Sequence, residues 1–190
     1  MTTTREKVIE TTCDLIELKG HFATGLNQIV EQSGAPKGSL YYHFPDGKEE
    51  IVEEAVLLAG RRTSENIRRA LETQAELPAA LKNFIEQIAD HIERSNFESG
   101  GPLTAVAMET AAGSPRINHA CRQAFTMLKG AFQQSLRKAG FSKGRSQDLA
   151  TFITASIEGG TILSRTYHTG DPLRTVAAEL ADKLKAELTG

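Results

Sequence analysis

The chain has 190 residues, enough for a small domain joined to a larger one, each with its own apolar core. Its charged fraction of 24% and formal net charge of −2 are ordinary for a globular protein. No apolar run approaches the roughly 18 residues of a membrane span, and the opening M-T-T-T-R-E-K-V lacks the apolar centre of a signal peptide. These features exclude a membrane-spanning protein, and we expect a cytoplasmic one.

The first 47 residues predict three short helices. The first runs from about Thr4 to Lys19 and ends at Gly20, where glycine can close a helix. A second, which Thr24 can cap, ends at Ser33, because Gly34 supplies the backbone freedom of a tight turn. A third begins near Pro36, whose missing N–H costs nothing in a first turn, and reaches Phe44.

Six further segments with helical spacing follow, about 48–72, 78–94, 102–112, from 115 onward, 145–167 and 171–188. Asp46 can cap the first of them. Because no segment shows the alternation of a strand, the predicted fold is all-α, with about nine helices. We expect a helix-turn-helix head over residues 1–47 and a ligand-binding and dimerisation domain over residues 48–190.

Two short helices joined by a glycine turn predict a helix-turn-helix, whose second helix enters the major groove of DNA. Lys37, in the first turn of that helix, can reach a guanine edge or a phosphate, and Ser39 is short enough to allow close approach. Tyr41, Tyr42 and His43 can place polar tips on phosphates or bases. Lys48 and the amides at the start of the next helix form a possible phosphate clamp.

Other interpretations of these residues stay open. Helix pairs with a glycine turn also occur in proteins that do not bind DNA. Phe44 is better explained as a core residue, and a core position is also the alternative for Tyr41. Residues 1–50 contain five cations against eight acidic residues, a net charge of −3, where a DNA-binding segment is expected to be basic. The stretch from Gly34 to His43, however, contains a lysine and no acidic residue.

The order of these signals is itself informative: Gly20 at the end of the first helix, then F-A-T-G-L-N-Q-I-V-E-Q-S-G, then P-K-G-S-L-Y-Y-H-F, then Lys48-Glu49-Glu50. This head resembles that of the TetR family of bacterial transcriptional regulators, and G-G-P-L-T-A-V-A-M-E resembles its LmrA/YxaF-type branch. The resemblance implies a homodimeric repressor with a small-molecule pocket in its C-terminal domain. It suggests these DNA-facing residues: Thr24, Lys37, Ser39, Tyr41, Tyr42, His43 and Lys48. The chain has Pro36 where the family commonly has a capping Ser or Thr.

A dimer is also expected on physical grounds, because two heads about 34 to 36 Å apart are needed to read a palindrome. The last two helices are the predicted interface. Gly159-Gly160 lies inside a helical segment and costs about 1 kcal/mol per glycine, which close approach of another helix explains. A kink or packing within one chain is the alternative.

The central helices carry more large apolar residues than a thin bundle needs, and we expect a pocket for a small apolar or aromatic ligand among them. The candidate lining residues are Phe84, Ile88, Met108, Phe125, Leu128, Phe132 and Phe152, each of which also fits a core position. Ligand binding would release the operator if the ligand favours a conformation in which the two heads are wrongly spaced for DNA.

An enzyme is the rival from another class. The sequence shows no glycine-rich phosphate loop, nucleophile elbow or metal-spaced set of ligands, so we expect no catalytic activity, cofactor or metal. Cys13 and Cys121 lie far apart without a Cys-x-x-Cys motif, which favours two reduced thiols, with redox sensing as the alternative. A second rival function is a ligand-binding or interaction protein of the same fold that has lost specific DNA binding.

Overall fold

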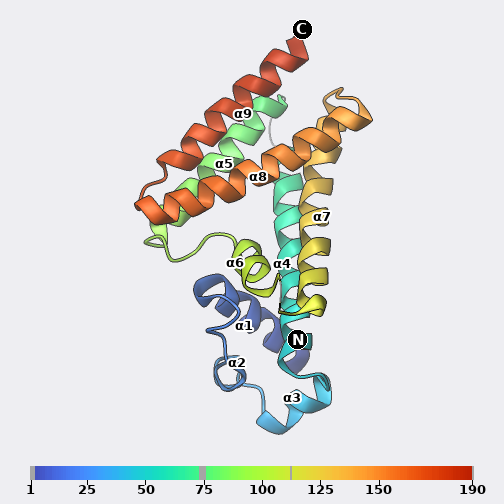
Figure 1. The fold of residues 1–190 in the computed structure, drawn as a ribbon, viewed down its shortest axis with the longest axis vertical. Coiled ribbons are helices and arrows are strands. Elements are labelled where there is room, and N and C mark those ends of the chain that lie inside the picture. Colours follow the sequence, from blue (N-terminus) through green and yellow to red (C-terminus); the bar gives the residue numbers. More distant parts are fainter. Residues whose placement is uncertain (1–2, 73–75, 112, 190) are drawn as a thin grey trace. The chain divides into compact units, whose positions relative to one another are not determined.

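The structure is a computed structural model that describes residues 3–72, 76–111 and 113–189. Over these ranges it contains nine α-helices and no strand, so the all-α prediction is confirmed (Figure 1). The helices are α1 Thr4–Lys19, α2 Leu26–Ser33, α3 Lys37–His43, α4 Lys48–Leu71, α5 Leu77–Arg94, α6 Pro102–Thr110, α7 Pro115–Lys138, α8 Lys143–Tyr167 and α9 Asp171–Thr189. The expected end of α6 at Ala112 falls outside the described residues.

The chain divides into two compact units. The first unit, which we call the head unit, combines residues 1–62 with residues 101–125, and the second combines residues 63–100 with residues 126–190. The head unit therefore contains the first part of α4, α6 and the first part of α7 in addition to α1, α2 and α3. The predicted domain boundary between residues 47 and 48 stays a prediction.

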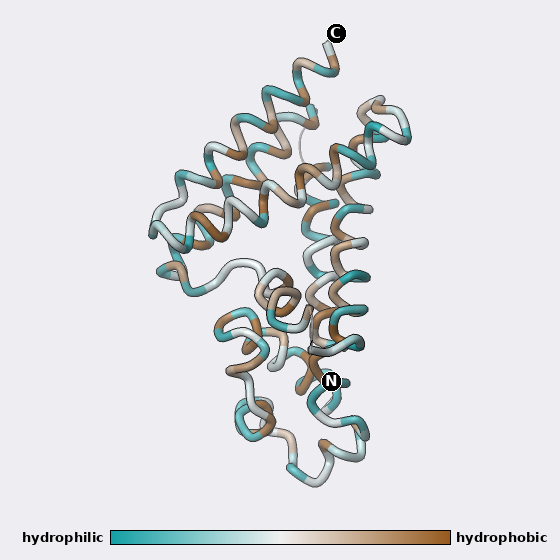
Figure 2. Tube along the Cα trace, viewed as in Figure 1, coloured by the Kyte–Doolittle hydropathy of each residue, from teal (hydrophilic) through white to brown (hydrophobic). Residues whose placement is uncertain are grey.

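Apolar and polar residues are interspersed along the trace (Figure 2). This is the pattern of helices that bury one face and expose the other. Among the described residues, no helix is long and apolar enough to cross a membrane.

Helix α1 begins and ends where capping rules place its limits. Thr3 and Glu6 form a capping box, in which the Thr3 hydroxyl accepts from the Glu6 N–H and the Glu6 carboxylate accepts from the Thr3 N–H. Gly20 closes the helix with φ of +79°, a conformation that side chains disfavour. The buried face includes Val8, Leu15 and Ile16, which fixes α1 against the rest of the head unit.

The turn between α2 and α3 also forms as predicted. Gly34 has φ of +65°, in the left-handed region, and so reverses the chain after Ser33. Pro36 is the N-cap residue of α3, one position before the helix, and no side chain caps the helix there. The core position expected for Phe44 is confirmed, since its side chain is 0% exposed, with the guanidinium carbon of Arg5 5.2 Å from the ring centroid.

One prediction about α2 is wrong. Its N-cap residue is Gly25, without a side-chain hydrogen bond, and Thr24 does not cap it. The Thr24 side chain is 0% exposed, and its hydroxyl donates to the Gly20 carbonyl at 2.8 Å. Thr24 therefore stabilises the connector between α1 and α2 from inside.

In the second unit, α5 and α9 lie side by side, and α8 packs against both (Figure 1). Arg174 of α9 donates to Glu93 of α5 at 2.9 and 2.7 Å and to Asp90 at 2.9 Å. The two bonds from Arg174 to Glu93, followed by one from the Gly170 N–H, lower the pKa of Glu93 to about 2. At Gly160 of α8, a Cβ would lie 2.9 Å from a methyl group of Leu173, so this glycine permits close packing of α8 on α9.

Candidate nucleic-acid interface

Helix α3 presents a dense set of exposed polar and aromatic side chains. Lys37 is exposed, Tyr41 is 58% exposed and Tyr42 is 83% exposed, so the alternative that placed Tyr41 in the core is wrong. His43 is half-buried, and its ring meets that of Tyr42 nearly edge-on at 5.2 Å between centroids. Exposed aromatic side chains gathered on one seven-residue helix are typical of an interaction surface.

Ser39 is half-buried, and its hydroxyl is already engaged. It donates to the Pro36 carbonyl at 2.7 Å, and the Ser39 N–H donates to the same carbonyl at 2.9 Å. The hydroxyl oxygen can still accept a hydrogen bond, whereas donation to a phosphate would require it to release Pro36.

Gly38 is a further feature of α3, and helical spacing alone does not single it out. It is exposed, its φ is not positive, and a Cβ built on it would meet no described atom within 4 Å. Glycine in a helix costs about 1 kcal/mol relative to alanine. Nothing inside the head unit therefore explains the absence of a side chain at this position.

Lys48, at the start of α4, already makes one hydrogen bond inside the head unit. Its ammonium donates to the His21 carbonyl at 2.9 Å, and burial lowers its pKa, an effect that nearby Glu109 opposes. An ammonium has three N–H donors, so others stay available for a phosphate. Lys48 can join the connector and DNA at the same time.

His21 follows α1 and is buried beside Lys48. Its Nδ1 has no hydrogen-bond partner among the described residues. Burial, followed by the charge of Lys48, lowers the pKa of its imidazole, while Glu109 and Glu49 act in the opposite direction. The neutral imidazole is thus the favoured form inside the head unit.

Arg116 of α7, which the sequence analysis missed, neutralises acidic residues of the head unit. It donates to Asp46 at 2.7 Å and to Glu53 at 2.6 Å. Asp46, predicted as the cap of α4, thus has its carboxylate bound by a residue 70 positions away. Arg116 thus compensates the Asp46 carboxylate, which the net charge of −3 over residues 1–50 includes, while its second partner, Glu53, lies outside that count as Arg116 does.

The seven predicted ligand contacts lie in different environments. Phe84 of α5 and Phe132 of α7 make a ring contact at 6.2 Å, and Leu128 is buried nearby in sequence on α7. Ile88 and Phe125 are half-buried, whereas Met108 is 73% and Phe152 50% exposed. The exposed pair fits an enclosed apolar pocket poorly.

A groove on the head unit contains none of these seven residues. It is lined by Arg5, Glu6, Ile9, Glu10, Glu54, Leu58 and Arg61. Five of these are charged, and Arg5 and Glu54 form an ion pair across it. Such a surface does not suit an apolar ligand.

Both cysteines are buried. Desolvation raises the pKa of each thiol to about 11, and oxidants react with thiolates rather than thiols. The described residues show no cluster of three or more His, Cys, Asp or Glu that could hold a metal ion.

The fold and this surface together define a helix-turn-helix protein with a second, all-helical unit. Residues 8–55 match the family described as bacterial regulatory proteins, tetR family, and residues 78–179 match the transcriptional regulator LmrA/YxaF-like C-terminal domain. The chain therefore belongs to the TetR family of transcriptional regulators, in its LmrA/YxaF-like branch, and is a DNA-binding protein.

Two relatives from Bacillus subtilis (strain 168) are similar over nearly the whole chain. The uncharacterised HTH-type transcriptional regulator YxaF is 37% identical, over 93% of this chain and 92% of its own length. The HTH-type transcriptional regulator LmrA is 34% identical, over 95% of this chain and 96% of its own.

Solved structures share the fold at lower identity. A TetR transcriptional regulator from Legionella pneumophila superposes with a TM-score of 0.81 at 18% identity, covering 96% of this chain and 98% of that one. The reduced form of E. coli NemR gives a TM-score of 0.83 at 18% identity, with 93% and 94% covered. At this identity the likeness concerns the fold alone.

Proposed function

We propose that the protein is a homodimeric repressor that binds a palindromic operator and is released from it by a small apolar or aromatic ligand. The observation that carries the DNA-binding part is the exposed surface of α3, where Lys37, Tyr41 and Tyr42 surround a glycine with no internal role. Aromatic hydroxyls and an ammonium on a short helix suit phosphates and base edges in the major groove. His43, Ser39 and Lys48 complete the proposed contacts, whereas buried Thr24 does not fit a direct one.

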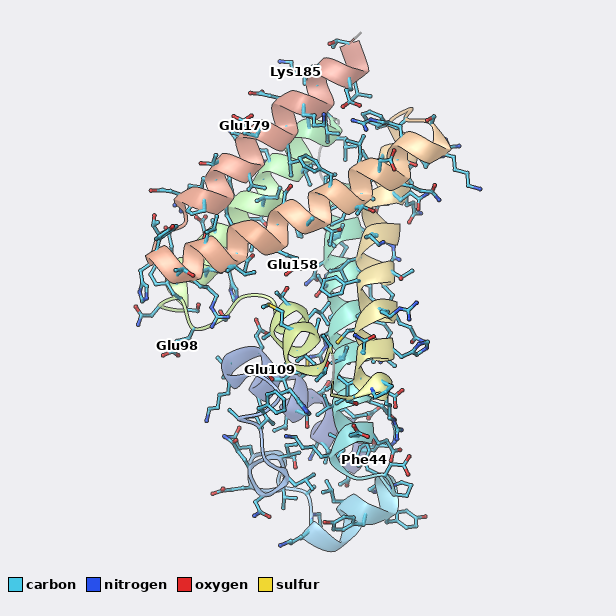
Figure 3. All side chains as sticks on the ribbon, in the orientation of Figure 1. Phe44, Glu98, Glu109, Glu158, Glu179 and Lys185 are labelled. Atoms are coloured by element: carbon cyan, nitrogen blue, oxygen red, sulfur yellow. The ribbon has the colours of Figure 1, made fainter. Side chains whose placement is uncertain are left out.

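The dimer would form through α8 and α9, with α8 contributing most of the apolar contact. Phe152, Leu163 and Tyr167 are exposed along α8, and Gly159 lies on the same face between them. On α9, in contrast, Glu179 and Lys185 are exposed and point away from its buried apolar face (Figure 3). We therefore reassign Phe152 from the ligand pocket to this proposed interface.

The effector would bind among the apolar residues of the central helices. Phe84 and Phe132, already in ring contact, are the best-supported members of such a site, with Ile88, Phe125 and Leu128 as further candidates. A thermal-shift screen of small molecules, followed by a test of whether each hit releases DNA, identifies the ligand. Hits that raise the melting temperature without releasing DNA would contradict induction by ligand.

A mobility-shift assay with the DNA upstream of the protein's own gene tests the function. We expect a palindromic footprint and an affinity that falls as salt is raised, because phosphate contacts release counterions. Operator binding at the level of random DNA would favour the alternative, a protein of this fold that has lost specific recognition.

Two α3 variants should separate base reading from phosphate contact. Lys37→Ala is expected to weaken operator binding about tenfold and to relax base preference at one position, since a guanine contact carries about 1–3 kcal/mol of discrimination. Tyr42→Ala should weaken operator and random DNA alike. Lys7→Ala, which removes an exposed cation from α1, is the control and should change affinity less than threefold. Equal losses on both DNAs for Lys37→Ala would remove its readout role.

Gly38→Ala should separate stability from DNA binding. Alanine is the better helix former by about 1 kcal/mol, so the variant should be as stable as the wild type or more stable. Its methyl group would stand where DNA approaches α3, and we expect operator affinity to fall about tenfold or more. Fluorescence anisotropy and thermal unfolding measure the two effects.

Gly130→Ala is the matched control for Gly38→Ala. Gly130 is also exposed within a helix, and a Cβ there would likewise meet no described atom within 4 Å. It should gain similar stability and keep wild-type operator affinity. If Gly38→Ala binds the operator as tightly as the wild type, DNA does not approach α3 at this position.

A further inference from the structure

A carboxylate on α6 binds the backbone that leads into the helix-turn-helix. Oε2 of Glu109, which is labelled in Figure 3, accepts from the His21 N–H at 2.7 Å and from the Phe22 N–H at 3.0 Å. These two amides follow the last turn of α1. Hydrogen bonds to an ionised acceptor are roughly twice as strong as those between neutral groups, so Glu109 holds the connector between α1 and α2 firmly to α6.

The sequence at Gly20 is adapted to this contact. A Cβ at Gly20 would lie 2.3 Å from Oε1 of Glu109, closer than any real contact, and the φ of +79° also disfavours a side chain. Gly20 thus provides the backbone conformation that ends α1 and leaves space for the carboxylate.

The connector is short and internally bonded, so it can transmit a displacement. The Thr24 hydroxyl donates to the Gly20 carbonyl, and the Thr24 N–H donates to the His21 carbonyl at 3.3 Å. Lys48 donates to that same His21 carbonyl from the start of α4. Helix α2 begins at Leu26, two residues after Thr24, and any shift of the connector therefore carries α2 with it.

The contact also joins the two regions that the family comparisons separate. His21 and Phe22 lie within residues 8–55, and Glu109 lies within residues 78–179. Two other residues of the segment 101–125 bond to α4 or the turn before it: Ser114 donates to Glu49, and Arg116 donates to Asp46 and Glu53. Glu109 reaches the connector that positions α2.

We propose that Glu109 is a positioning residue that sets operator affinity: it fixes the α1–α2 connector to α6, so that the position of α6 determines the placement of α2 and α3 on DNA. The proposal rests on the proposed function, since it requires an operator. Loss of this contact should weaken specific binding more than non-specific binding, because α3 would keep its charge and lose its fixed orientation.

The test compares full-length wild type with Glu109→Ala and Glu109→Gln. We expect Glu109→Ala to lower operator affinity at least tenfold, to change affinity for random DNA less than threefold, and to speed hydrogen exchange at the His21 and Phe22 amides at least tenfold. Glu109→Gln keeps one carbonyl acceptor. It should therefore retain part of the operator affinity and part of the protection of the two amides from hydrogen exchange.

Electrostatics alone predicts the opposite sign. Removing a negative charge from a DNA-binding head strengthens its attraction to phosphates. Glu31→Gln, which removes an exposed carboxylate from α2, is the matched control and should bind DNA as tightly as the wild type or more tightly. If Glu109→Ala loses operator affinity and Glu31→Gln keeps it, the loss is therefore due to a displaced α1–α2 connector and not to the change in charge.

The outcomes that overturn the proposal are distinct from those that overturn the proposed function. A wild-type chain without operator affinity would overturn both. If the wild type binds its operator and folded Glu109→Ala binds it within twofold as tightly, the positioning role is overturned and the proposed function stands. The positioning role is also overturned if Glu109→Ala lowers the affinity for the operator and the affinity for random DNA by the same factor.

Discussion

Replacing Phe44 by alanine is expected to lower the free energy of unfolding by about 3–5 kcal/mol, the cost of removing a large buried aromatic side chain. Phe44 is 0% exposed, lies directly after α3 and is the only residue of the Y-Y-H-F stretch that is fully buried (Figure 3). Its ring fixes the end of α3 in the core of the head unit. Urea unfolding followed by circular dichroism measures the loss.

In Phe44→Ala, the head unit should unfold before the second unit. Helix α3 has seven residues and cannot persist without packing, so Phe44→Ala should also abolish operator binding at temperatures where the second unit stays folded. Phe44→Leu retains most of the apolar volume and should cost less than half as much. A Phe44→Ala variant with wild-type stability would mean that the head does not depend on this side chain.

Arg5 provides a second comparison at the same site. Its guanidinium lies over the Phe44 ring and also pairs with Glu54. Cation–π contacts at exposed sites contribute about 0.5–1 kcal/mol. The apolar burial of Phe44 thus contributes far more to the head than the charge above it.

The limits of the helices were predictable because they depend on local signals. Gly20 and Gly34 end helices through positive φ, and the predicted limits of α1, Thr4 and Lys19, are confirmed. Thr24 shows where local reasoning is insufficient. Its residue type suits a cap, but the chain turns its hydroxyl inward to Gly20, and the cap position passes to Gly25.

The contacts that position the candidate site were not predictable, because they join residues far apart in sequence. Glu109 reaches His21 across 88 positions, and Arg116 reaches Asp46 across 70. No spacing rule connects such pairs: Glu109 ends the stretch G-G-P-L-T-A-V-A-M-E, but that motif does not indicate that its carboxylate binds the α1–α2 connector. The exposed residues of α3 can be predicted from the sequence. The bonds that hold the segments around α3 in place are seen only in the three-dimensional structure.

The two glycines of the pair Gly159-Gly160 have different surroundings in the structure, although the sequence suggests one explanation for both. From the sequence alone, close approach of another helix explains the pair, and packing inside one chain is the alternative. Gly160 faces α9 of its own chain, where a Cβ would meet Leu173. At Gly159 a Cβ would meet no described atom within 4 Å, so packing inside the chain does not explain this second glycine, whereas the proposed dimer would.

Gly159→Leu is therefore expected to separate the dimer and to lower operator affinity about 100-fold or more. A leucine at the centre of the proposed α8 interface would prevent a second α8 from approaching. Two linked heads gain a factor of roughly 10² to 10⁴ over one head through effective concentration, and a monomer loses that gain. Sedimentation equilibrium at micromolar concentration and operator titration measure the two effects.

Gly160→Ala is the matched control for Gly159→Leu, since it places one methyl group against Leu173 within the same chain. It should lower thermal stability while leaving the protein dimeric. A dimeric Gly159→Leu with wild-type operator affinity would exclude the centre of α8 from the interface. A monomeric variant that still binds its operator at wild-type affinity would show instead that one head suffices, and the palindrome would then lose its physical basis.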